Sequence, residues 1–189
     1  GHNTAVGSQS QLNATTGEYN TSLGSLSMGV GVTTGDYNAA LGYKAGEDLT
    51  SGVRNTLVGS FAGGGLTSGA HNVAVGYGAL NAEDAHGKNV AIGYTALSVL
   101  NAGAHGHNVA IGYQAGIAMT TAVGNILVGS EAGDALTTGS YNTALGYLAL
   151  STEDAHGGNV AIGYSALKTQ DAGADGFNTA IGYDAGANI

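Results

Sequence analysis

The chain has 189 residues, a net charge of −9, and no cysteine, proline or tryptophan. The negative charge argues against nucleic-acid binding, which requires basic patches, and the lack of cysteine excludes a disulfide framework and thiolate chemistry. No stretch of 18 consecutive apolar residues occurs, so no membrane-spanning helix is expected in this segment.

A five-residue motif, Asn-x-Ala-aliphatic-Gly, recurs along the whole chain at intervals of 17 to 19 residues. A period this short predicts one small unit stacked on itself, not a globular domain with a single cleft. We therefore expect residues 1–189 to form one continuous all-β array, a parallel β-solenoid of about eleven coils that is a piece of a longer fibre. The motif asparagines are Asn3, Asn20, Asn38, Asn55, Asn72, Asn89, Asn108, Asn125, Asn142, Asn159 and Asn178.

A second period of 70 residues lies on the first, because Asn38, Asn108 and Asn178 are 70 residues apart. The sequence of residues 89–94 recurs in residues 159–164. Four residues after each motif glycine, the residue type follows the order Gly, Gly, Leu, Leu from coil to coil. This pattern predicts four alternating coil types and the duplication of a four-coil block. The first two units match the others least, as expected at the end of a solenoid.

The centre of each motif is expected to be a short strand. Position four is aliphatic in every copy and position two is mostly Thr or Val, so both lie on one strand face. Position three, on the opposite face, is Ala, Ser or Leu. Because neither face carries charge, we expect one face to line the coil and the other to need a partner surface.

The glycine that closes each motif is expected to occupy a corner, where a positive φ or a close backbone approach excludes a side chain. These glycines are Gly7, Gly24, Gly42, Gly59, Gly76, Gly93, Gly112, Gly129, Gly146, Gly163 and Gly182. The motif asparagines are expected to form a ladder, because an amide both donates and accepts hydrogen bonds.

A tyrosine follows the corner glycine in seven units, and Ala or Ser stands two residues further on. This Gly-Tyr-x-Ala pattern predicts a turn into a second short strand. The tyrosine row is interpreted either as a packing seam with polar tips or as a sugar-stacking platform.

The remaining residues form loops that hold most of the charge and are expected to face solvent. Pairs of hydroxyl residues recur at one loop position, either as turn hydroxyls that cap backbone groups or as O-glycan sites. The pairs are Thr15 and Thr16, Thr33 and Thr34, Thr50 and Ser51, Thr67 and Ser68, Thr120 and Thr121, and Thr137 and Thr138.

Two loops carry candidate metal ligands. His86 with Glu83 and Asp84, and His156 with Glu153 and Asp154, are interpreted as solvated loop residues, with a Ca²⁺ or Zn²⁺ site as the alternative. His105 and His107 form a Gly-x-His-x-His sequence whose neutral imidazoles suit a transition metal. The matching segment of the next block, residues 173–177, lacks both histidines, so no metal and no cofactor are expected.

Residues 108–116, Asn-Val-Ala-Ile-Gly-Tyr-Gln-Ala-Gly, resemble the head repeats of trimeric autotransporter adhesins, and similar repeats occur in fibre proteins of tailed phages and large viruses. The resemblance covers the whole chain. It implies a left-handed parallel β-roll, a homotrimer with three chains side by side, and an attachment role on a cell or virion surface. The 17–19-residue coils are longer than those of the adhesin heads, with the excess in the loops. Gly-x-His-x-His is similar to a sequence of phage tail-fibre tips, where three chains hold iron.

These patterns favour a non-enzymatic, extracellular fibre module, either an adhesin head or the shaft of a phage fibre. An enzyme is not expected, because each acid, histidine and serine belongs to a repeated loop instead of one pocket. The expected partners are other copies of the chain, in a homotrimer or polymer, and a surface glycan or host receptor. One alternative is a self-assembling, glycosylated extracellular filament. Another is an ice-binding solenoid, which requires a flatter and more regular threonine face than position two provides.

Overall fold

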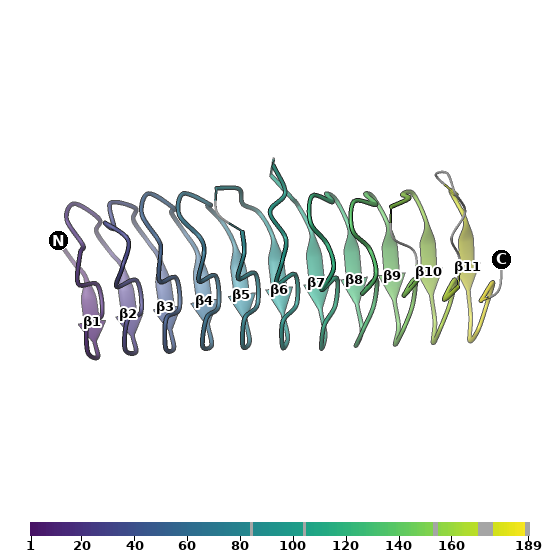
Figure 1. Ribbon diagram of the computed structural model, residues 1–189, viewed down its shortest axis with the longest axis horizontal. Coiled ribbons are helices and arrows are strands. Elements are labelled where there is room, and N and C mark those ends of the chain that lie inside the picture. Colours follow the sequence, from purple (N-terminus) through teal and green to yellow (C-terminus); the bar gives the residue numbers. More distant parts are fainter. Residues whose placement is uncertain (84, 104, 153–154, 170–175, 188–189) are drawn as a thin grey trace.

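The structure, a computed structural model, describes residues 1–83, 85–103, 105–152, 155–169 and 176–187. Within these ranges the chain is all-β and contains no helix. It winds into a β-solenoid of about ten turns, in which one parallel sheet of eleven strands runs the length of the rod in sequence order (Figure 1). The expected solenoid of short coils is thereby confirmed.

Each strand has three residues and occupies positions two to four of a motif. The strands are β1 (Thr4–Val6), β2 (Thr21–Leu23), β3 (Ala39–Leu41), β4 (Thr56–Val58), β5 (Val73–Val75), β6 (Val90–Ile92), β7 (Val109–Ile111), β8 (Ile126–Val128), β9 (Thr143–Leu145), β10 (Val160–Ile162) and β11 (Thr179–Ile181). Equivalent motif positions pair throughout, as in Leu57 with Ala74 and Ala91 with Ala110. The loops therefore absorb the variation in coil length, and the sheet keeps one register.

The middle residue of each strand faces the interior. Ala74, Ala91 and Ala110 are fully buried, whereas the larger aliphatic residues at position four point outward. Leu145, for example, remains 45% exposed. A single chain thus covers only one face of its sheet. The small side chain is inside because a coil this narrow leaves little room behind the strand.

The larger core side chains come mostly from the turns and loops. They stack along the axis with the strand alanines as one continuous hydrophobic cluster. The largest fully buried side chains are Met28, Leu49, Leu57, Leu66, Leu80, Leu97, Leu100, Met119, Leu127, Leu136, Leu150 and Leu167.

The 70-residue period has a packing explanation. The side chain of Leu57, the middle residue of β4, fills the space beside Gly46 and Gly63, where an added Cβ would lie 2.7 Å from a Leu57 methyl group. In the next coil the large side chain lies in the turn instead of the strand, because Ala74 stands in the strand and Leu80 in the turn. The strand leucine therefore fills the core beside the glycine turns, and the turn leucine fills it where the strand has alanine.

The expected second strand is absent, and this prediction is wrong for the described chain. The residues after the corner glycine form a tight turn, closed in one coil by the Ala45 amide donating to the Gly42 carbonyl at 3.3 Å. Lys44 and Phe61 in these turns have φ of +57° and +58°. A left-handed residue at this place interrupts the extended backbone that a strand requires, and the following alanine is directed into the core.

Candidate functional site

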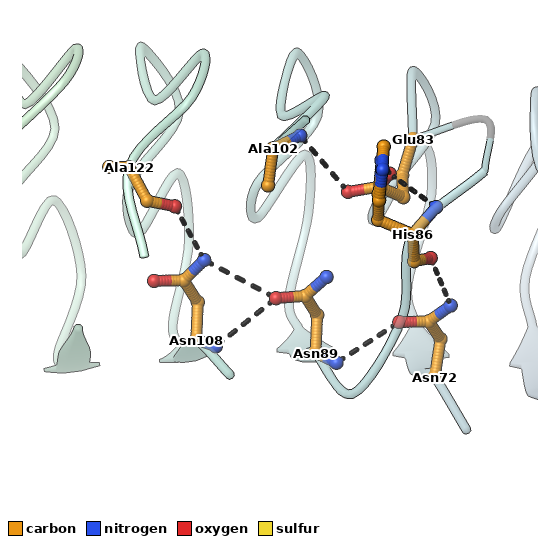
Figure 2. Close-up of polar contacts among 7 residues, drawn as sticks. All are labelled: Asn72, Glu83, His86, Asn89, Ala102, Asn108 and Ala122. Carbon is orange, nitrogen blue, oxygen red and sulfur yellow. Dashed lines mark hydrogen bonds and ion pairs between the residues drawn. The ribbon is translucent and has the colours of Figure 1, made fainter. Parts of the chain in front are cut away.

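The asparagine ladder lies buried beside the sheet and connects neighbouring coils. The backbone N–H of Asn55 donates to Asn38 Oδ1 at 3.0 Å, and Asn55 Nδ2 donates to the Gly69 carbonyl at 2.8 Å. Figure 2 shows the Asn89 N–H donating to Asn72 Oδ1 and the Asn108 N–H donating to Asn89 Oδ1. Nδ2 of Asn72 and of Asn108 also donates to a carbonyl, that of His86 and Ala122 respectively. These contacts connect the amides to the next coil, so the ladder has a structural role.

The corner glycines have φ between +126° and +144°, with Gly7 and Gly146 at the two limits. An added Cβ on Gly42 would lie 2.6 Å from the Gly59 carbonyl oxygen in the next coil. Both a left-handed backbone and a close inter-coil approach therefore exclude a side chain, and this row too is structural.

The acidic loop of the fifth coil, which begins at Asn72, is not fully solvated as expected. Glu83 was expected to be solvated but is fully buried. Its Oε1 accepts from the His86 N–H at 3.1 Å and its Oε2 accepts from the Ala102 N–H at 3.4 Å, while His86 Nδ1 lies 3.5 Å from Oε1 (Figure 2). The carboxylate is buried because it serves as the acceptor for backbone amides of two adjacent loops.

The other members of the two acidic loops give no metal site that can be described. Asp84, Glu153 and Asp154 lie outside the described residues. His156 is half-buried, and its carbonyl accepts from Asn142 Nδ2 at 3.1 Å.

Removal of the Glu83 carboxylate is expected to destabilise the fifth coil. Glu83→Ala leaves two backbone N–H groups without these acceptors, and each buried unsatisfied group costs ~1–3 kcal/mol. Amide hydrogen exchange of residues 83–102 is expected to accelerate. Glu18→Ala, at an exposed carboxylate, is the control and is expected to leave exchange in this region unchanged. Equal protection in both variants would contradict the role assigned to Glu83.

His105 and His107 are brought together on an exposed loop, with ring centroids 6.1 Å apart in an edge-on arrangement. The positive charge of nearby Lys88, followed by partial desolvation, lowers the pKa of His105. Within the described ranges, no three His, Cys, Asp or Glu side chains are grouped so as to hold a metal ion. Two imidazoles of one chain supply only part of a coordination shell, so a site here would need ligands from further chains.

The hydroxyl pairs separate into two rows. The first members approach backbone carbonyls of the next coil, with Thr33 Oγ1 3.2 Å from the Leu49 carbonyl and Thr50 Oγ1 2.9 Å from the Thr67 carbonyl. Thr120 Oγ1 likewise donates to the Thr137 carbonyl at 3.2 Å. The second members form an exposed row along the loops, in which Thr34 Oγ1 also donates to the Thr50 carbonyl at 3.4 Å. They are Thr16, Thr34, Ser51, Ser68, Thr121 and Thr138.

The tyrosine row lies beside the carboxyl ends of the strands, and its rings are half exposed. Tyr77 and Tyr94 stack with centroids 5.3 Å apart, and Tyr94 and Tyr113 follow at 5.5 Å. Tyr94 is 49% exposed. The rings thus pack on one another, as a packing seam would, and leave about half of their surface exposed. The sugar-stacking interpretation of this row stays a prediction.

A second aromatic row, which the sequence analysis missed, precedes the asparagines. His2, Tyr19 and Tyr37 stack with centroid distances of 4.9 and 5.1 Å, and the Arg54 guanidinium lies 5.6 Å from the Tyr37 ring centre. The residue immediately before the motif asparagine is His, Tyr or Phe in seven of the eleven units, and this is the signal that identifies the row.

The outward face of the sheet carries a row of exposed aliphatic side chains along the rod. We call the outward residues at positions two and four of all eleven strands the apolar face. It contains no charged residue, and Leu41, Ile111, Ile126 and Leu145 are among its exposed members. With neighbouring strands about 4.8 Å apart, the face extends for roughly 50 Å. Contiguous exposed apolar patches of this kind mark interaction sites.

Comparisons with protein-family models, with curated proteins and with solved structures gave no match for this chain. Among the residues described, no helix has the length and apolar character needed to cross a membrane.

Proposed function

We propose that this chain is a non-enzymatic fibre module that associates side by side with other copies through its apolar face. The observation that carries the proposal is the uninterrupted row of outward aliphatic side chains along β1 to β11. Fully burying one such side chain stabilises an assembly by ~1.5–3 kcal/mol, and about half of that remains where the residue is already half covered. Repetition in every coil makes the sum large.

A homotrimer is one closed assembly that covers this face. Three rods placed around a common axis turn their apolar faces toward one another, and a closed symmetric arrangement leaves none of them exposed. The resemblance of the motif to adhesin-head and tail-fibre repeats favours the same arrangement. In this proposal the rod is an adhesin head or a fibre shaft on a cell or virion surface, with its loops available for attachment to a surface glycan or host receptor.

Two lysines on the apolar face are expected to dissociate the assembly. In Ile111→Lys/Leu145→Lys, both charges would have to be buried between chains, which is unfavourable without partners. Light scattering is expected to give about three times the 18.4 kDa chain mass for the unaltered protein and the mass of one chain for the variant.

The control for this experiment is Thr121→Lys/Thr138→Lys, which adds the same charge to exposed loop positions and is expected to remain trimeric. Circular dichroism should show that both variants keep the β-solenoid. A monomeric unaltered chain, or trimers in both variants, would refute assembly through the apolar face.

The second candidate is a glycosylated, self-assembling filament. It is favoured by the exposed row of second hydroxyls in the loops, from Thr16 to Thr138, since these side chains are accessible for modification. The intact mass of denatured protein from its natural source would exceed 18.4 kDa if glycans are attached. Electron microscopy would then show whether rods join end to end, and unmodified protein that forms no polymer would eliminate this candidate.

A further inference from the structure

A hollow of about 320 Å³ opens beside the tyrosine row in the fifth coil. Its lining residues come from the fourth to the sixth coil. They are Phe61, Tyr77, Gly78, Asn81, Thr95 and Ser98. We call it the Gly78 hollow.

The hollow exists because one coil lacks a side chain that its neighbours have. The position after the tyrosine row is left-handed in each coil and is occupied by Lys44, Phe61, Thr95 and Gln114 around Gly78, whose φ is +61°. A Cβ built on Gly78 would meet one atom within 4 Å, the Thr95 methyl carbon at 3.5 Å. Side-chain volume is therefore missing at Gly78, and a side chain would fit there.

The second four-coil block shows the same place filled. Leu148 stands 70 residues after Gly78 and has φ +53°. Glu131 and Lys168 occupy the places of Phe61 and Ser98. In the duplicated block a leucine therefore stands in the place of Gly78, and two of the six lining positions carry a charge.

The lining combines an aromatic wall with neutral polar groups. The rings of Phe61 and Tyr77 lie edge to face with centroids 5.9 Å apart. Asn81 and Ser98 add an amide and a hydroxyl, and no charged side chain lines the space. Thr95 Oγ1 is buried without a hydrogen-bond partner in the described structure, an arrangement that a bound hydroxyl can relieve after rotation about χ1.

We propose that the Gly78 hollow binds a neutral sugar ring. A sugar offers an apolar C–H face to the rings of Phe61 and Tyr77, and its hydroxyls both donate to and accept from Asn81, Ser98 and Thr95. A few polar groups on an otherwise apolar wall are the usual composition of a small-molecule site. A charged ligand would find no counter-charge in the lining. All six residues belong to one chain, so the inference goes beyond assembly through the apolar face and does not depend on it.

Saturation-transfer difference NMR tests the inference with glucose, galactose, mannose, N-acetylglucosamine and their β-linked disaccharides as probes. At least one is expected to receive saturation from the unaltered protein at millimolar concentration. Gly78→Leu fills the hollow with the residue that Leu148 already places in the same backbone conformation, so it is expected to fold and to weaken binding more than tenfold. Gln114→Leu, in the same row two coils further on, is the control and should bind as the unaltered protein does.

A second variant tests the polar contact. Thr95→Val keeps the shape but removes the hydroxyl, and it is expected to weaken binding several-fold. The inference is overturned if no probe receives saturation or if Gly78→Leu binds as well as the unaltered protein. The same titration on Ile111→Lys/Leu145→Lys separates the two proposals, because sugar binding by a dissociated rod supports the hollow whatever the outcome for assembly.

Discussion

Gly59→Ala is expected to disrupt the stacking of the fourth and fifth coils, with a loss of at least ~3 kcal/mol in the free energy of unfolding. The new Cβ would lie 2.5 Å from the Gly76 carbonyl oxygen. Since β4 and β5 on the same two coils are hydrogen-bonded in register, the backbone has little freedom to move away. The φ of +128° at Gly59 adds strain of its own. Urea denaturation measures the loss, and hydrogen exchange locates it.

Gly103→Ala is the comparison at a glycine that lacks both the close neighbour and the wide φ of the corner. Gly103 has a φ of +56° and no atom within 4 Å of an added Cβ, so alanine there meets a left-handed backbone without a clash. Its cost is expected to be near ~1 kcal/mol. If both variants lose the same stability, neither the close approach between coils nor the φ near +130° explains the glycine in each corner.

Leu57→Ala is expected to cost ~2–5 kcal/mol, because it leaves a cavity between Gly46 and Gly63 in a tightly packed core. Gly63→Leu alone is also expected to destabilise the rod, since its side chain would collide with Leu57. The double variant Leu57→Ala/Gly63→Leu, which keeps Leu66, reproduces the arrangement of the sixth coil, where Ala91, Leu97 and Leu100 are all buried. It is expected to recover most of the loss.

The backbone permits this exchange, because Gly63 has φ +56° and Leu80 has φ +52°. Thermal unfolding of the two single variants and the double variant forms a complete cycle, from which the coupling energy is obtained. If the double variant loses as much stability as the two single variants lose together, the 70-residue period does not arise from exchange of core volume.

We assign two tasks, assembly and sugar binding, to different sides of one rod. The apolar face lies on the strands, whereas the Gly78 hollow lies in the turns that follow them. Because stacking repeats each coil position at a fixed register, a change of one residue in one coil alters a surface without disturbing the coils around it. The Gly78 hollow and its filled counterpart at Leu148 illustrate how a repeat array can acquire a local site in this way.

The sequence alone was sufficient to locate the strands, the corner glycines and the asparagine ladder. Each of these depends on a residue type that returns at a fixed spacing, and stacking converts that spacing directly into contact between coils. Asn38 and Asn55, for example, are 17 residues apart and become hydrogen-bonded neighbours. The period of the motif therefore specifies most of the fold.

Only the tertiary structure decided which strand face lies inside. Both faces are uncharged, so alternation along the strand does not distinguish them, and the choice follows from the narrow coil, which admits Ala74 and leaves Val73 and Val75 outside. The burial of Glu83 and the hollow at Gly78 depend on neighbours in adjacent coils, Ala102 and Thr95. These features are set by how much volume and how many hydrogen-bond partners the adjacent coils supply, and a residue pattern within one coil does not specify either quantity.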